Sequence, residues 1–167
     1  MNRLAAVGVL LLVVCAALSA GADRLGKGDT DYATFLRLSY PERKSQIAQL
    51  PLEEQVAAYL KMIVERHPPD LELAAILAPG GRPLVNVVRK WIDSERTDEV
   101  DRSFLIFLLL EVQTSGYDDL HADEGLISQL ERVVGEMKTQ SVRASSSRFL
   151  DLIKSPPSKG GQTPRGP

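Results

Sequence analysis

The chain is almost without cysteine: its 167 residues include one, Cys15, which lies in an apolar leader near the N-terminus. Neither a disulfide within the chain nor a thiolate zinc site can form, and once the leader is removed a cysteine nucleophile is excluded as well. Histidine is nearly as rare, since only His67 and His121 occur, and this limits most schemes of acid–base catalysis. The fold must therefore be stabilised by packing, and catalysis has few candidate groups.

The sequence also lacks the short motifs that mark common chemistries. It contains no phosphate-binding glycine loop, no nucleophile elbow, no His-Glu zinc motif and no paired cysteine ligands. Aromatic and β-branched residues do not form the runs of a sheet, whereas Leu, Ala, Glu, Gln and Arg are frequent. These features predict an all-α protein that is not an enzyme and needs no cofactor.

Acidic and basic residues are balanced in number but not in position. Residues 23–137 carry 21 acidic and 13 basic side chains, a net charge of −8, whereas residues 138–167 carry six basic and one acidic, a net charge of +5. The body is acidic and its basic residues are not interleaved with aromatic ones, so nucleic acid is not an expected partner. A basic tail is usually solvated, and contact with an anionic surface is the alternative.

Residues 1–22 have the three parts of a secretory signal: a positive charge at Arg3, an uninterrupted apolar stretch, and small residues at the end. We predict cleavage after Ala22, with Ser19 or Ala20 as alternative sites, and export to the periplasm or the extracellular space. An uncleaved anchor that tethers a structural protein is the main alternative, because Leu4–Ala22 holds 19 uncharged residues and a bilayer needs roughly 20. Acylation of Cys15 is a weaker alternative, because Val14 precedes it.

Seven consecutive apolar residues, Phe104 to Leu110, lie inside a longer predicted helix, residues 97–114. Seven consecutive positions of a helix point in every direction, so this helix has no polar side. We therefore expect it to be a central buried helix that its neighbours cover on nearly all of its circumference.

Other amphipathic stretches surround this helix in the sequence and together predict an all-helical domain over residues 31–139. Residues 23–30 are predicted to be a polar linker, and residues 140–154 a partly ordered basic segment with a short amphipathic helix near Phe149. Residues 155–167 are dominated by Pro, Gly, Ser, Lys and Gln, which predicts a disordered tail. The remaining expected helices cover residues 31–38, 41–50, 51–66, 71–77, 83–95 and 125–138.

The two amphipathic stretches that flank the central helix repeat their apolar residues at an offset of 42. The matching pairs are Leu84 with Leu126, Val85 with Ile127, Val88 with Leu130, Trp91 with Val133 and Ile92 with Val134. At residues 83–92, 100–112 and 126–134 the chain resembles HEAT or armadillo-type helical repeats, within residues 52–139 at most. This resemblance implies a curved binding scaffold without chemistry of its own. The expected fold is thus a compact multi-helix bundle or a short HEAT-like stack of helical hairpins.

An acidic loop that contains a histidine is the candidate metal site. Its possible ligands are Asp118, Asp119, His121, Asp123 and Glu124, which supply carboxylate oxygens and one imidazole. Their spacing does not match an EF-hand, and carboxylates that cap the following helix explain the same residues more simply. Glu111, a lone acid beside the apolar run, is a second candidate for acid chemistry.

Three apolar or aromatic residues are candidates for contact with a protein partner: Tyr117 in the loop, and Phe149 and Leu150 in the C-terminal segment. With a secretion signal, a helical core and no catalytic constellation, the sequence favours an exported, non-enzymatic interaction or accessory module. A membrane-tethered structural protein and a metal-binding protein or enzyme centred on the acidic loop are the alternatives.

Overall fold

The structure, a computed structural model, describes residues 28–156, and every regular element in that range is a helix. The predicted all-α fold is therefore confirmed, with no strand between Gly28 and Pro156. The predicted signal at residues 1–22, most of the predicted linker and residues 157–167 of the predicted tail lie outside the described residues.

The chain divides between Pro51 and Leu52 into two compact units. This division falls inside the range 31–139 that the sequence predicts as one domain. The first unit contains α2 (Gly28–Arg37), α3 (Tyr40–Gln46) and the short 3₁₀ helix η1 (Ile47–Gln49). Helix α2 thus begins inside the predicted linker. Glu42 stabilises the start of α3, because its carboxylate accepts a hydrogen bond of 2.8 Å from the backbone N–H of Ser39.

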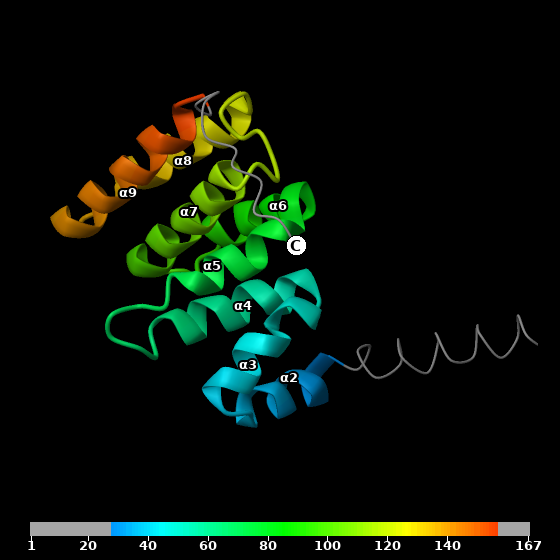
Figure 1. Ribbon diagram of the computed structural model, residues 1–167. Helices are drawn as coiled ribbons and strands as arrows, with labels where there is room; N and C mark the ends of the chain where they lie inside the picture. Colours follow the sequence, from blue (N-terminus) through cyan, green and yellow to red (C-terminus); the bar gives the residue numbers. More distant parts are fainter. Residues whose placement is uncertain (1–27, 157–167) are drawn as a thin grey trace, which may run out of the picture. The chain divides into compact units, whose positions relative to one another are not determined.

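The second unit is built from six α-helices and one 3₁₀ turn among its described residues. Figure 1 shows α7 between α5 and α9, and α7 contacts α4, α5, α6 and α9. The elements are α4 (Leu52–Ile63), α5 (Glu72–Leu77), η2 (Ala78–Gly80), α6 (Gly81–Ile92), α7 (Glu99–Thr114), α8 (Glu124–Glu136) and α9 (Gln140–Lys154).

Helix α7 has clear start and stop signals. The Asp98 carboxylate accepts hydrogen bonds of 2.8 Å from the backbone N–H groups of Val100 and Asp101 and so caps the first turn. Gly116 has a φ of 74°, and beyond it Tyr117 N donates to the carbonyl of Val112 at 3.1 Å. A left-handed glycine followed by this bond ends a helix by satisfying its last carbonyl groups.

The core of the second unit centres on α7, as the apolar run predicts. Leu105, Ile106, Leu108 and Leu109 are all 0% exposed. Tyr59 of α4 is also fully buried, and its hydroxyl donates to the carbonyl of Phe104 at 3.0 Å. Burial, and secondarily the charge of Glu111, raises the pKa of Tyr59, so this phenol stays protonated and keeps its hydrogen bond to α7.

The C-terminal segment differs from its prediction. Residues 140–154 are not a partly ordered segment with a short helix: they form α9 over its whole length, packed on α7 and α8. Tertiary contacts explain the full-length helix, because Leu150 and Ile153 are buried and Ser146 is 0% exposed on the same inner side. Three consecutive serines have only moderate helix propensity, so packing rather than local preference stabilises this helix.

Candidate interaction groove

An open apolar groove of about 350 Å³ lies along α7 between α9 and the start of α5. Helix α7 forms its floor, and small or apolar side chains form its walls. The lining residues are Val100, Ser103, Phe104 and Phe107 of α7, Ser141, Val142, Ser145 and Phe149 of α9, and Leu71 just before α5.

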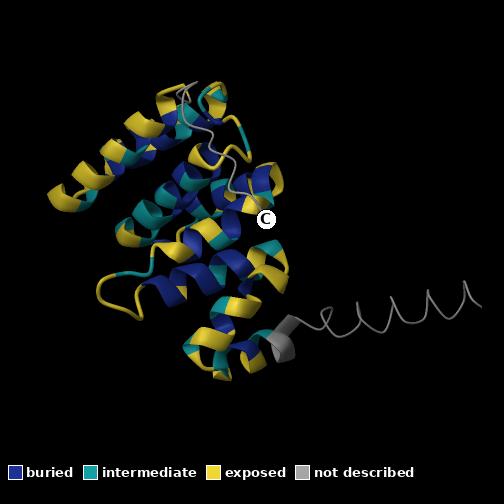
Figure 2. Ribbon diagram, in the orientation of Figure 1, coloured by how far each residue is buried: buried dark blue, intermediate teal, exposed yellow. Residues whose placement is uncertain are grey.

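The floor of the groove corrects the prediction that neighbours cover α7 on nearly all sides. Val100 is 43% exposed, and Phe104 and Phe107 are each only partly buried. In Figure 2 this incomplete burial appears as teal along much of α7. The three residues follow the spacing i, i+4, i+7, so they form one stripe on the helix. The second unit therefore covers most of α7 and leaves one apolar stripe open along the groove.

Helix α9 supplies one wall of the groove. The ring of Phe149 packs against the ring of Phe107 with 5.4 Å between centroids and a tilt of 56°, an arrangement that aromatic pairs prefer. Ser141 and Ser145 are exposed along the same wall, and their small side chains keep the groove open.

The three predicted interaction residues have different positions. Phe149 is half-buried and lines the groove, so it remains a candidate contact. Leu150 is 5% exposed and belongs to the core, because a helix turns by about 100° per residue and places neighbouring side chains on different sides. Tyr117 is 50% exposed in the loop between α7 and α8 and does not line the groove.

Polar contacts at both ends hold α9 in place beside α7. The Glu99 carboxylate accepts hydrogen bonds from the backbone N–H groups of Lys138 (2.7 Å) and Thr139 (2.9 Å), just before α9 begins. These bonds lower the pKa of Glu99, so the carboxylate stays charged at the positive end of the helix dipole. At the other end Lys154 pairs with Glu131 of α8 at 2.7 Å. These contacts hold the α9 wall of the groove in place against α7 and α8.

The acidic loop before α8 makes ion pairs with Arg82 of α6. The guanidinium of Arg82 lies 2.6 Å from an oxygen of Asp118 and 2.6 Å from an oxygen of Asp123. Asp123 also accepts a hydrogen bond of 2.9 Å from Leu126 N, which confirms the predicted cap of this helix. The bond from Leu126 is the main cause that lowers the pKa of Asp123, and Arg82 adds to it.

The other three predicted metal ligands, Asp119, His121 and Glu124, take no part in the ion pairs with Arg82. His121 contacts Asp119 through Nδ1, and Glu124 is the first residue of α8. Within residues 28–156 no group of three or more His, Cys, Asp or Glu side chains could hold a metal ion. The five candidates are thus divided between an arginine pair, a histidine contact and a helix start. Glu111, the other candidate acid, is half-buried on α7.

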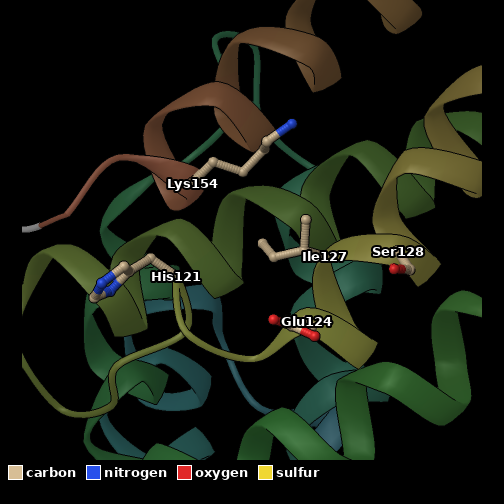
Figure 3. Close-up of a pocket in the computed structure, with 5 residues that line it drawn as sticks. All are labelled: His121, Glu124, Ile127, Ser128 and Lys154. Carbon is tan, nitrogen blue, oxygen red and sulfur yellow. The ribbon is translucent and has the colours of Figure 1, made fainter.

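A shallow hollow of about 360 Å³ beside the acidic loop contains several polar groups. Figure 3 shows that His121 and Ser128 lie at opposite ends of this hollow, with Glu124 and Ile127 between them. Lys154 extends away from the loop and pairs with Glu131. The arrangement does not place a hydroxyl next to the imidazole, which a serine nucleophile would need.

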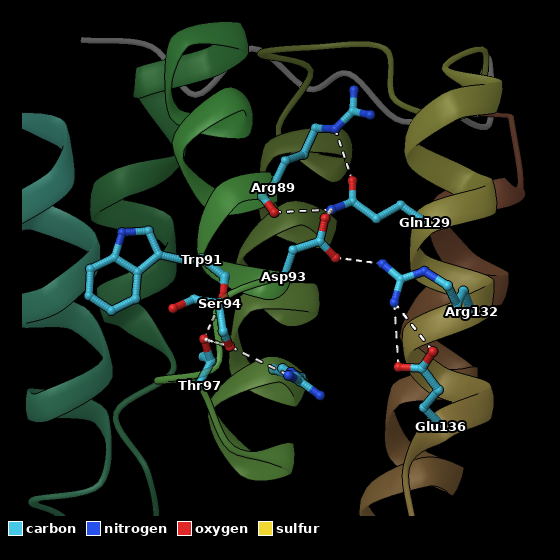
Figure 4. A network of polar contacts seen from close by, with 9 residues as sticks. Arg89, Trp91, Asp93, Ser94, Thr97, Gln129, Arg132 and Glu136 are labelled. Atoms are coloured by element: carbon cyan, nitrogen blue, oxygen red, sulfur yellow. Dashed lines mark hydrogen bonds and ion pairs between the residues drawn. The ribbon is translucent and has the colours of Figure 1, made fainter.

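A second polar network joins α6 to α8 (Figure 4). Gln129 accepts from Arg89 Nε at 3.0 Å and donates to the carbonyl of Arg89 at 3.0 Å and to Asp93 at 2.8 Å. Arg132 pairs with Asp93 at 2.5 Å. The network could not be predicted from the sequence, because its partners on α6 and α8 lie 36 to 40 residues apart and have no local signature. It fixes α8 against α6 and leaves the groove side of α7 untouched.

Asp123 provides a test of the loop contacts through pH. Its lowered pKa means that it stabilises the folded state above the unfolded-state pKa of about 3.9, and that this contribution is lost as the pH falls through the lower folded-state pKa. Asparagine keeps the cap but loses the charge. We therefore expect Asp123→Asn to be less stable than the unchanged protein at pH 7, with a difference that shrinks as the pH falls below about 3.9, by urea unfolding followed by circular dichroism.

Two further variants complete this test. Asp123→Ala loses the cap as well and should cost about 1 kcal/mol at pH 7. Asp119→Asn makes the same change of charge in the same loop at a carboxylate that is 61% exposed, so its effect should be smaller. Equal pH profiles for Asp123→Asn and Asp119→Asn would contradict the role given to the Arg82 pair.

Comparisons with models of protein families, with curated proteins and with solved structures find no match. None of the helices within residues 28–156 is both long enough and apolar enough to cross a membrane. The function must therefore be inferred from the groove, the loop and the charge pattern of this chain.

Proposed function

We propose that this chain is an exported, non-enzymatic interaction module that binds a helical segment of another protein in the groove between α5, α7 and α9. The observation that carries the proposal is the apolar stripe Val100, Phe104 and Phe107, which the rest of the second unit leaves partly open. Each of these side chains would lose more contact with water if a partner covered it, and burial of apolar area is the main favourable term in association.

A helix suits this groove better than an extended strand. A bound strand needs an open sheet edge for its backbone hydrogen bonds, and residues 28–156 contain no sheet. The open stripe repeats at i, i+4 and i+7, which is the spacing at which two helices meet. The serines of the α9 wall also allow a partner helix to approach closely.

Export remains a prediction from residues 1–22, and the repeat resemblance remains a prediction that also favours a binding scaffold. In the alternative, a membrane-tethered protein, residues 1–22 stay attached to the chain. The intact mass of the native product decides between the two, because cleavage after Ala22 removes 22 residues.

Binding in the groove is tested with a designed amphipathic helix of about 18 residues, roughly five turns, with leucines on one side and glutamine on the other. In a titration of ¹⁵N-labelled protein we expect amide shifts concentrated at Val100–Phe107 and Ser141–Phe149. Shifts confined to other surfaces, or no shifts at all, would contradict the proposal.

A matched pair of valines gives the control. Val100 is 43% exposed in the groove, and Val64 is 45% exposed just beyond α4 and does not line it. Val100→Gln should weaken binding of the peptide about fivefold, or about 1 kcal/mol, because part of a valine side chain is no longer buried on binding. Val64→Gln should leave the dissociation constant unchanged.

A further inference from the structure

We infer that the partner helix carries an acidic flank that lies against α9. This inference rests on the proposed function and adds the chemistry of the partner. It depends on the distribution of charge along the rims of the groove, in particular on the guanidinium of Arg148 beside the α9 wall.

The exposed residues of α9 next to the groove form a single stripe: Ser141, Ser145, Arg148 and Leu152, spaced i, i+4, i+7 and i+11. Two of them, Ser141 and Ser145, line the groove directly. Arg148 is one turn further along and is exposed, so its guanidinium extends from the rim of the same wall.

Arg148 makes no hydrogen bond or ion pair with any other described residue. Neighbouring basic groups of α9 are already engaged: Arg143 Nε donates to the carbonyl of Met137 at 2.7 Å, and Lys154 pairs with Glu131. A guanidinium presents a planar set of donors that fits a carboxylate with two hydrogen bonds. The serine hydroxyls beside it can donate to the same carboxylates.

The opposite rim has the opposite charge. Leu71, which lines the groove, lies between Asp70 and Glu72 at the start of α5. These carboxylates disfavour an acidic side chain on the α5 rim, because like charges repel. A helix with acidic residues on one flank only therefore fits the groove in one orientation, with that flank toward α9.

A bilayer surface fits this face less well. An anionic membrane would also attract Arg148, but Phe104 and Phe107 are only partly exposed between the two walls of a groove, a shape that a flat surface does not fill. A helix has the shape to enter between α9 and the start of α5, so a protein helix is the partner that the geometry supports.

The test compares three versions of the designed helix that differ in one flank: glutamine, glutamate or lysine. At about 20 mM salt exposed charges are weakly screened. We therefore expect the glutamate version to bind roughly threefold to fivefold more tightly than the glutamine version, which is the effect that one exposed ion pair typically has. The lysine version should bind more weakly than both. At about 0.5 M salt the three affinities should converge.

Charge reversal on the protein identifies the residue responsible. Arg148→Glu should invert the order, so that the lysine version binds most tightly, while the glutamine version binds as before. Lys61→Glu makes the same change at an exposed residue of α4 that does not line the groove, and should leave the order unchanged.

The outcomes separate the two proposals. If the glutamine helix binds in the groove but the glutamate and lysine versions bind equally, the acidic flank is wrong and the proposed function stands. If no version binds, both are wrong. Binding of vesicles of phosphatidylcholine and phosphatidylglycerol that Val100→Gln abolishes would assign the face to a membrane, and a dimer that the same substitution dissociates would assign it to a second copy. Either result overturns the acidic-helix partner.

Discussion

Leu109→Ala is expected to lower the free energy of unfolding by about 2 to 5 kcal/mol, the range for a buried leucine that leaves a cavity. Leu109 is 0% exposed in the middle of α7, the helix that contacts four other helices of the second unit. A cavity there removes contacts that no single neighbour can restore by moving. Small domains are stable by about 5 to 15 kcal/mol, so this loss is a large part of the total.

Urea unfolding followed by circular dichroism measures the change, and Leu152→Ala on α9 is the matched control. Leu152 is 56% exposed, so its truncation removes little buried area and should cost no more than about 0.5 kcal/mol. Equal losses at the two positions would mean that α7 is not the centre of the core.

Leu150→Asp is expected to destabilise the protein by at least about 3 kcal/mol, because an unpaired carboxylate would replace an apolar side chain in the core. Leu150 is 5% exposed where α9 packs on α7 and α8. No basic residue that the structure describes lies beside it on the inner side of α9, where Ser146 and Ile153 are its buried neighbours.

The control is Leu152→Asp, the same substitution two residues further along the same helix at an exposed position. It should have little effect on stability, and the two variants can be compared by thermal unfolding and by amide exchange of α9. If both variants were equally stable, α9 would not be part of the core, and the predicted partly ordered segment would be the better description of residues 140–154.

The central helix was predictable from local features of the sequence. The run Phe104–Leu110 predicted a buried helix near residues 97–114, and α7 spans Glu99–Thr114 with its central residues in the core. The bounds were predictable because the signals are local: an aspartate at the N-cap, a glycine after the last turn and an apolar run between them.

The candidate sites were predicted less well. The sequence places Asp118, Asp119, His121, Asp123 and Glu124 close together along the chain, and this proximity suggested a metal site. The structure directs Asp118 and Asp123 to Arg82, which precedes them by 36 and 41 residues. A partner so distant in sequence has no local signature, so the pair could not be inferred from the loop.

The sequence by itself determined that the described chain is helical, approximately where most helices begin and end, and that the longest apolar run lies inside α7, because propensity, capping and periodicity act over a few residues. Only the tertiary structure decided that α9 forms along its whole length, that Leu150 is core while Phe149 lines a groove, and that α7 keeps one apolar stripe open. A run of seven apolar residues has no polar side to mark which of its faces stays uncovered. That choice depends on how many neighbours pack around it and where their side chains end.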